Sequence, residues 1–169
     1  MTMIKRQGVL FVFFLIILTA AVSEGSWRNR KAPDFSLAGL SGQRVSLSDM
    51  RGKVVFIDFW ATWCPPCKKE FPELKRLTAE FKDKAFVTLA VSEDKVRSNV
   101  YKFTSDYPDM PANLIVLLDK RSDAIKKYSV GAMPTSFIID ARGVIRYIHF
   151  GYKESDPETW RSEIKTLIK

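Results

Sequence analysis

Cysteine and histidine are scarce in this sequence, and their scarcity excludes three uses of the thiols. The chain has only two cysteines, Cys64 and Cys67, too few and too close for the disulfide framework of a small secreted protein. A structural zinc ion needs four ligands, and beyond these cysteines the chain offers one histidine, His149. Covalent haem attachment needs a histidine directly after the second cysteine, where this chain has Lys68. We therefore expect no metal and no cofactor.

A hydrophobic run long enough to cross a membrane is also lacking. The longest apolar stretch, Val9 to Val22, has 14 residues, whereas a spanning helix needs about 20. Lys5 and Arg6 precede it and small residues follow, the pattern of a secretory signal. We interpret residues 1–23 as a signal peptide, or as an N-terminal membrane anchor if it is not cleaved. The absence of a following cysteine excludes a lipoprotein. The positive charges predict that the remainder is extracytoplasmic, in the periplasm or on the outer face of the membrane.

Clusters of one charge are missing as well. The formal net charge is +8, but basic and acidic residues are interspersed, as in Lys68-Lys69-Glu70, which we interpret as solvated surface. The sequence has no basic stripe interleaved with aromatic residues, so nucleic acid is not an expected partner. Weak attraction to an anionic membrane or an acidic partner is the alternative interpretation of the net charge. We expect a monomer.

What the chain does contain is an alternation of strands and helices. A polar linker over residues 24–31 leads into one domain over residues 32–169. The near-continuous apolar run over residues 54–60 predicts a central strand covered on both faces. The order of elements predicts an α/β fold with helices on both faces of the sheet. The expected elements are a hairpin over 34–37 and 45–47, strands over 54–60, 85–91, 114–118, 135–139 and 144–150, and helices over 67–81, 94–107, 122–128 and 156–168, the second helix capped by Ser92.

The sequence Cys64-Pro65-Pro66-Cys67 lies at the junction between the central strand and the helix after it. A cysteine at a helix N-terminus faces free N–H groups and the positive end of the helix dipole, which favour its thiolate. We therefore expect Cys64, the more exposed of the two, to be the nucleophile. Cys67 can then resolve the mixed disulfide. A structural disulfide is the alternative, although so short a loop constrains little of the unfolded chain.

Asp58 interrupts the apolar run six positions before Cys64. If the strand is covered on both faces, the carboxyl group is buried, and burial raises its pKa. Such a group can move a proton to or from Cys67 when the second cysteine attacks, so we assign Asp58 to the catalytic residues. The alternative is an aspartate that faces water at the edge of the sheet.

Residues 56–68, Phe-Ile-Asp-Phe-Trp-Ala-Thr-Trp-Cys-Pro-Pro-Cys-Lys, resemble the active-site stretch of the thioredoxin superfamily. Residues 32–35 and 45–49, the leader, and the extra helical segment after the second core strand resemble its extracytoplasmic TlpA/ResA-like branch, which is related to the AhpC/TSA proteins. The similarity covers residues 32–168. It implies a thioredoxin fold: a central mixed β-sheet flanked by helices, with an N-terminal hairpin and an extra helical insertion.

The resemblance also implies roles for single residues. Met133–Pro134 corresponds to the cis-proline bond of the family, beside the nucleophile, where the backbone would pair with an extended substrate. Asp58 matches the buried acid of thioredoxin, whereas some ResA-like relatives carry Asn there and a Glu elsewhere. Ile57 and Ala61 stand where the peroxiredoxin relatives need proline and threonine, which disfavours peroxidase activity. Substrate contacts are expected from Trp63, Pro65, Pro66, Met133, Pro134 and Thr135.

These observations predict a thiol–disulfide oxidoreductase. Pro65 and Pro66 offer no N–H group to the Cys64 thiolate, which favours a reducing protein. The resemblance implies protein thiols and disulfides as clients, apocytochrome c among them, and a membrane thiol carrier as the electron donor. Two alternatives are a disulfide oxidant or isomerase for secreted proteins, and a non-catalytic binding module with the thioredoxin fold.

Overall fold

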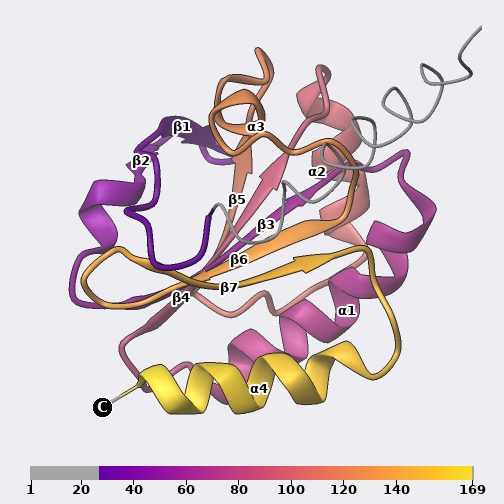
Figure 1. The fold of residues 1–169 in the computed structure, drawn as a ribbon. Helices are drawn as coiled ribbons and strands as arrows, with labels where there is room; N and C mark the ends of the chain where they lie inside the picture. The colour runs from indigo at the N-terminus through magenta and orange to yellow at the C-terminus, as the bar shows by residue number, and fades with distance from the viewer. Residues whose placement is uncertain (1–26, 169) are drawn as a thin grey trace, which may run out of the picture.

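The computed structural model describes residues 27–168, so the predicted signal peptide or anchor over residues 1–23 lies outside the described residues. Helices and strands alternate along the chain, as the sequence predicts (Figure 1). No helix within residues 27–168 is long and apolar enough to cross a membrane. In chain order the elements are β1 (Ser36–Gly39), β2 (Arg44–Ser46), the 3-10 helix η1 (Leu47–Met50), β3 (Val54–Trp60), α1 (Pro65–Glu80), β4 (Phe86–Ser92), α2 (Arg97–Ser105), β5 (Leu114–Leu118), α3 (Asp123–Lys127), β6 (Thr135–Ile139), β7 (Ile145–Phe150) and α4 (Asp156–Leu167).

The strands form one mixed sheet in the order β2-β1-β5-β4-β3-β6-β7. Strands β3, β4 and β5 run parallel, and the other neighbouring pairs are antiparallel. The N-terminal hairpin β1–β2 and the helix α2, inserted between β4 and β5, are both present. The predicted fold class is therefore confirmed. Within the predicted linker, Lys31 forms an isolated bridge with Val144, the residue before β7.

The central strand β3 explains why the sheet needs helices on both faces. All seven of its residues are buried, so its side chains must alternate between two apolar layers. Phe56 and Trp60 belong to the layer beneath α1 and α4, and Ile57 and Phe59 belong to the layer on the opposite face. By the same alternation, Asp58 faces the side of α1 and α4.

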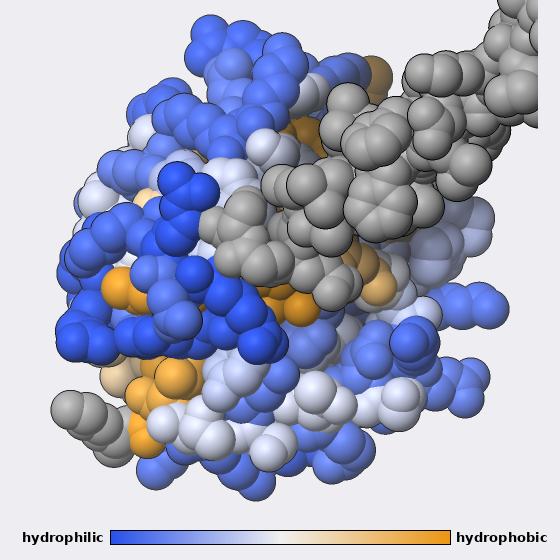
Figure 2. All heavy atoms as spheres, viewed as in Figure 1, coloured by the Kyte–Doolittle hydropathy of each residue, from blue (hydrophilic) through white to orange (hydrophobic). Residues whose placement is uncertain are grey.

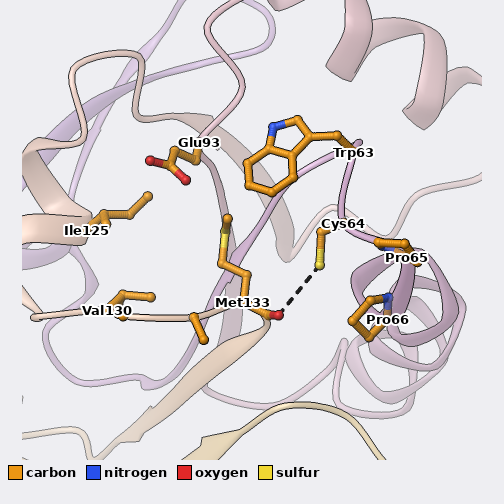
Figure 3. Close-up of a pocket in the computed structure, with 10 residues that line it drawn as sticks. Trp63, Cys64, Pro65, Pro66, Glu93, Ile125, Val130 and Met133 are labelled. Carbon is orange, nitrogen blue, oxygen red and sulfur yellow. Dashed lines mark hydrogen bonds between the residues drawn. The ribbon is translucent and has the colours of Figure 1, made fainter.

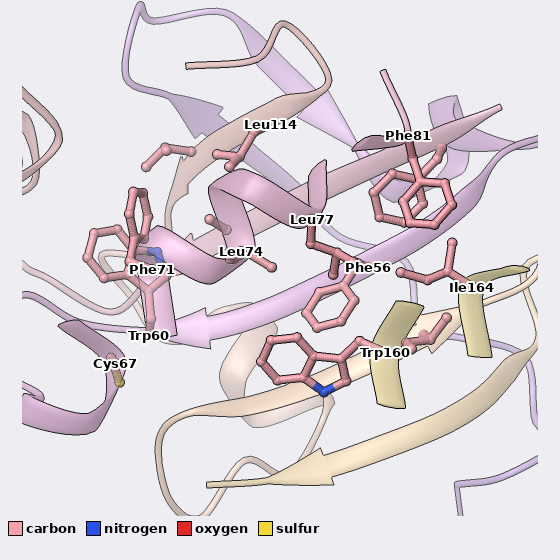
Figure 4. Close-up of a cluster of buried hydrophobic side chains, with 14 of the residues drawn as sticks. Phe56, Trp60, Cys67, Phe71, Leu74, Leu77, Phe81, Leu114, Trp160 and Ile164 are labelled. Atoms are coloured by element: carbon pink, nitrogen blue, oxygen red, sulfur yellow. The ribbon is translucent and has the colours of Figure 1, made fainter. Parts of the chain in front are cut away.

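Helices α1 and α4 lie together on one face of the sheet (Figures 1 and 4). Residues 71, 74 and 77 of α1 share one side of the helix at spacings of three residues, and all three are buried against the sheet. Trp160 of α4 packs edge-on against Phe56, with 5.3 Å between the ring centroids. The active-site helix is thus anchored by an aromatic and aliphatic core. On the opposite face, Tyr128 contacts Phe59 and Phe137 beside the short helix α3.

Helix α2 begins later than the sequence predicts, and Ser92 is not its cap. Ser92 is the last residue of β4, paired with Trp60 and Leu118, and its hydroxyl donates to Asp94 at 2.8 Å. Because the sheet and Asp94 already engage Ser92, the helix starts after Val96, whose side chain makes no capping hydrogen bond.

The face of the molecule drawn in Figure 2 is dominated by hydrophilic residues, with small hydrophobic areas between them.

His149 lies on β7 and forms a 2.7 Å contact with Glu163 of α4. It is part of the packing between β7 and α4.

Candidate active site

Three segments meet where the parallel strands end, because the sheet register brings them there. Strand β3 ends at Trp60 beside Ser92, the last residue of β4. The antiparallel strand β6 begins at Thr135, opposite Phe59. The turn after β3, the residues after β4 and the loop before β6 therefore lie at one edge of the sheet, the edge at which α/β sheets bind their ligands.

Cys64 is the N-cap residue of α1 and is joined to Cys67 by a disulfide of 2.03 Å. The backbone N–H of Cys67 donates to the Cys64 sulfur at 3.3 Å. Pro65 and Pro66 occupy the first turn of the helix and have no N–H to add. Cys64 is 4% exposed and Cys67 is 1% exposed, so both sulfurs are largely covered and Cys64 is the more accessible.

The loop before β6 presents a backbone carbonyl to the Cys64 sulfur. The Met133–Pro134 peptide bond is cis, as the resemblance implies, and the Met133 carbonyl oxygen lies 3.7 Å from the Cys64 sulfur (Figure 3). The Thr135 hydroxyl donates to the Ala132 carbonyl at 2.7 Å, and the Gly151 N–H donates to the Pro134 carbonyl at 2.8 Å. These two hydrogen bonds hold the loop in position against Cys64.

A groove of about 490 Å³ opens beside Cys64. Four of the six predicted substrate-contact residues line it: Trp63, Pro65, Pro66 and Met133. Pro134 and Thr135 are not among the lining residues: Thr135 is the first residue of β6, and the Pro134 carbonyl accepts from Gly151, just after β7. The Trp63 side chain is 62% exposed, which is unusual for an indole and places an apolar surface next to Cys64. The full lining is Trp63, Cys64, Pro65, Pro66, Glu93, Ile125, Val130, Gly131, Ala132 and Met133.

Asp58 is buried, as its place in the apolar run predicts. It is 2% exposed, and its Oδ1 atom makes no hydrogen bond to any described residue. Burial raises the pKa of this carboxyl group from 3.8 to about 8, since an anion without hydrogen-bond donors is poorly stabilised away from water. Near neutral pH, Asp58 therefore carries a proton that it can exchange.

A second buried acid, Glu70, corrects the sequence analysis. Lys68 and Lys69 are exposed as expected, but Glu70 is 1% exposed, and neither of its carboxyl oxygens finds a hydrogen-bond partner within residues 27–168. Burial raises its pKa well above the ordinary value, and the charges of Asp58 and Asp156 raise it further. Glu70 follows Cys67 by three residues, so both point from α1 toward the sheet and Asp58.

Asp94 holds the active-site turn to the end of β4. Its buried carboxylate accepts hydrogen bonds from the Thr62 backbone N–H at 2.8 Å, the Thr62 hydroxyl at 2.6 Å and the Ser92 hydroxyl at 2.8 Å. A carboxylate with three donors is well satisfied although it is buried. This residue fixes the backbone two positions before Cys64.

Replacing Asp94 with alanine is expected to destabilise the protein by about 3 kcal/mol, since three donors lose their acceptor in a buried place. Urea unfolding of the disulfide form measures this change. Glu158→Ala is the matched control: it removes an exposed carboxylate paired with Arg161 and should cost less than about 0.5 kcal/mol. Equal stabilities for the two variants would contradict the role of Asp94.

Comparison with known protein families matches residues 29–148 to the AhpC/TSA family. The chain belongs to the AhpC/TSA family.

Relatives in the AhpC/TSA family share most of the chain. The ResA thiol–disulfide oxidoreductase of Bacillus cereus is 35% identical over 153 residues, which cover 83% of this chain and 87% of that protein. The thioredoxin-like protein YneN of Bacillus subtilis is 40% identical over 129 residues, 75% of this chain and 74% of that protein. The crystal structure of a Chlorobium tepidum protein assigned to the thiol:disulfide interchange protein DsbE superposes with a TM-score of 0.76 at 38% identity, over 83% of this chain and 96% of that chain.

This AhpC/TSA family member is a thiol–disulfide oxidoreductase of ResA/DsbE type, with Cys64 and Cys67 as its CxxC pair. The predicted resemblance and the predicted enzyme class are confirmed. Sequence reasoning missed three acidic residues around this pair: Glu70, Glu93 and Asp94. The available signal for Glu70 was its spacing, three residues after Cys67 and four before Leu74, on the buried side of α1.

Proposed function

We propose that this oxidoreductase works outside the cytoplasm as a reductant of protein disulfides. The observation that carries the direction is the small number of N–H donors to the Cys64 sulfur, which leaves a thiolate there poorly stabilised. Of the N–H groups in the first turn of α1, only that of Cys67 donates to the Cys64 sulfur, because the two intervening residues are prolines. A dithiol whose thiolate is weakly stabilised gives up electrons readily, whereas a strongly stabilised thiolate makes an oxidant.

Two further features support a thiol rather than a thiolate at Cys64 in the reduced protein. The Met133 carbonyl oxygen, 3.7 Å from the sulfur, can accept a hydrogen bond from a thiol and repels a thiolate. The buried acids Asp58 and Glu70 lie on the Cys67 side of α1, where any negative charge on them opposes a second one on sulfur. Both effects raise the pKa of a cysteine thiol.

The reaction needs no metal and no cofactor in this proposal. The Cys64 thiolate attacks a client disulfide and releases the first client thiol. Cys67 then attacks the Cys64 sulfur and releases the second, which leaves the protein with its own disulfide. Asp58 and Glu70 lie on the Cys67 side of α1, and the raised pKa of each leaves the ionised carboxylate as its minor form near neutral pH. The ionised form of one of them takes up the Cys67 proton in this second step. A membrane thiol carrier would reduce the protein again.

The location and the client rest on other observations. Lys5 and Arg6 before the apolar stretch Val9 to Val22 support delivery across a membrane. Resemblance to the TlpA/ResA-like branch supports extracytoplasmic thiols as clients, apocytochrome c among them. We expect the protein to act as a monomer. The groove beside Cys64 offers an extended client a place next to the Met133 backbone.

The test is the reduction potential of the Cys64–Cys67 pair, measured by equilibration of the purified protein in defined dithiol/disulfide buffers. A value near or below that of thioredoxin, about −270 mV, is expected of a reductant. A value near about −120 mV would make the protein an oxidant and overturn the proposed direction. If the two cysteines formed no reversible disulfide, the fold would serve binding rather than redox exchange.

A further inference from the structure

The groove beside Cys64 contains one carboxylate that the exchange chemistry does not use. We propose that Glu93 determines specificity: it favours client disulfides that carry a lysine or arginine one or two residues from the attacked cysteine. This inference rests on the proposed function, because it concerns the clients of the same dithiol, and it adds the charge that a preferred client bears.

The sheet register fixes Glu93 next to the nucleophile. Glu93 is the first residue after β4, and its backbone N–H donates to the Trp60 carbonyl at the end of β3, at 3.0 Å. Three residues after Trp60, the chain reaches Trp63 and then Cys64. Glu93 therefore enters the groove from a rigid strand end, while Cys64 enters it from the neighbouring one.

The surroundings of Glu93 make its charge prominent. Among the described residues that line the groove, Glu93 is the one charged residue. Its carboxyl group lies near Ile125, on the side of the groove away from Pro65 and Pro66, with Trp63 and Met133 between (Figure 3). A half-buried carboxylate in such an apolar lining interacts with a cation more strongly than one in open water, because the local dielectric constant is lower.

The carboxylate of Glu93 is oriented but not neutralised. The Ser122 hydroxyl donates to Oε1 at 3.2 Å, and the Lys95 ammonium in turn donates to the Ser122 oxygen at 2.8 Å. The hydroxyl thus separates the two charges, and within residues 27–168 no cationic group comes within 4.0 Å of Glu93. Oε2 accepts no hydrogen bond from the described part of the chain, so it is available to a client's ammonium or guanidinium group.

A client cation near the attacked cysteine suits this arrangement. A client that pairs with the Met133 backbone is extended, so a residue one or two positions from its cysteine stays within the length of the groove. The long side chain of lysine or arginine can then reach Glu93 across the Trp63 and Met133 side chains. The pair would form as the client docks, before electrons move.

The test uses disulfide-linked dimers of short blocked peptides, each with one cysteine flanked at both adjacent and both next positions by lysine, alanine or glutamate. Each turnover transfers two electrons from the Cys64 and Cys67 thiols to the peptide disulfide, and their two protons end on the two released peptide thiols. The full-length reduced protein is mixed with each dimer, and the second-order rate constant of peptide release is measured at low and at high salt.

The wild-type protein is expected to reduce the lysine peptide roughly three- to tenfold faster than the glutamate peptide, relative to the same ratio in Glu93→Gln. The ratio of ratios removes the intrinsic difference in reactivity between the peptides, because the variant attacks the same disulfides. Glu93→Gln keeps an oxygen that can accept from Ser122, so the turn is preserved. High salt should reduce the preference.

Asp83→Asn is the matched control, since it also removes one negative charge but lies just before β4, at the opposite end of the sheet. It should keep the wild-type preference, and Glu93→Lys should reverse it. An unchanged preference in Glu93→Gln, or equal loss in Asp83→Asn, would overturn the proposal.

Failure of the proposed function would look different. It would appear as exchange that runs only from peptide thiols to the protein disulfide, for the alanine peptide as well as the charged ones. In that case the rate constants for oxidation of the lysine and glutamate peptide thiols by the protein disulfide are compared. A lysine-to-glutamate ratio that is higher in the wild type than in Glu93→Gln would still support the role of Glu93.

Discussion

Replacing Cys67 with serine should convert the protein into a trap for its clients. Cys64 can still attack a client disulfide, but without Cys67 the mixed disulfide is not resolved and accumulates. Non-reducing gels of cells that carry Cys67→Ser should show covalent adducts that disappear with a reductant. Turnover of a model disulfide should fall by a factor of about 10³ or more, since both cysteines act as one catalytic unit.

Cys64→Ser should lose turnover to the same extent without accumulating adducts. The reason is burial: Cys67 is 1% exposed, behind Cys64 and the first turn of α1, so a client disulfide cannot reach it. The double variant, with serine at both positions, controls for non-covalent capture. Adducts that form as fast in Cys64→Ser as in Cys67→Ser would make Cys67 the nucleophile and contradict the order of the two steps.

Replacing Asp58 with asparagine should stabilise the protein strongly at alkaline pH. Burial raises the pKa of Asp58 from 3.8 to about 8 in the folded protein. Between these values the folded protein holds a proton that the unfolded chain has lost, so the free energy of unfolding falls as the pH rises, by about 1.4 kcal/mol per pH unit. Asp58→Asn has no such group to titrate, so its free energy of unfolding does not fall in this way. The difference from the wild type should be small at pH 4 and on the order of 5 kcal/mol above pH 8.

Urea unfolding of the disulfide form at a series of pH values from 4 to 9 measures this effect. Glu70→Gln is the informative partner: it should also flatten the pH dependence, because the pKa of Glu70 is raised by burial and by Asp58. Asp83→Asn, which removes an exposed carboxylate, should leave the wild-type curve unchanged. In rapid-mixing experiments, Asp58→Asn should slow the attack of Cys67 by roughly 10²-fold. A pH dependence identical to that of the wild type would show that Asp58 ionises normally.

The sequence predicts the fold and the position of the Cys64–Cys67 pair because their signals are local. The apolar run predicts β3 at Val54–Trp60. Because both faces of this strand are covered, the side chain of Asp58 within it is buried. Cys64 and Cys67 follow at the helix start, and their spacing alone lets one sulfur reach the other. The resemblance adds the cis bond at Met133–Pro134, which depends on tertiary packing and carries only a weak local signal.

The acidic residues around the site were missed because their roles depend on tertiary structure: on the buried face of α1 for Glu70, and on the sheet register for Glu93 and Asp94. Glu70 follows two exposed lysines, so its charged neighbours in the sequence predict an exposed side chain, whereas its position on α1 predicts a buried one. Asp94 was assigned to a helix because Ser92 resembles a cap. Only the pairing of Ser92 with Trp60 shows that Ser92 is the end of β4, so that Asp94, two residues later, meets Thr62.

The disulfide joins residues only three apart in the chain. So small a ring barely restricts the unfolded polypeptide, so in the unfolded protein the cysteine pair behaves like that of a free peptide. Folding and reduction together form a closed thermodynamic cycle. The difference in unfolding free energy between the disulfide and dithiol forms then equals the difference in reduction free energy between the folded and the unfolded pair. If the disulfide form resists urea better, the fold favours the oxidised cysteines and the protein donates electrons; if the dithiol form does, the protein accepts them. Two unfolding curves, recorded without a redox buffer, thus report the direction of electron flow at about 1.4 kcal/mol for every 30 mV.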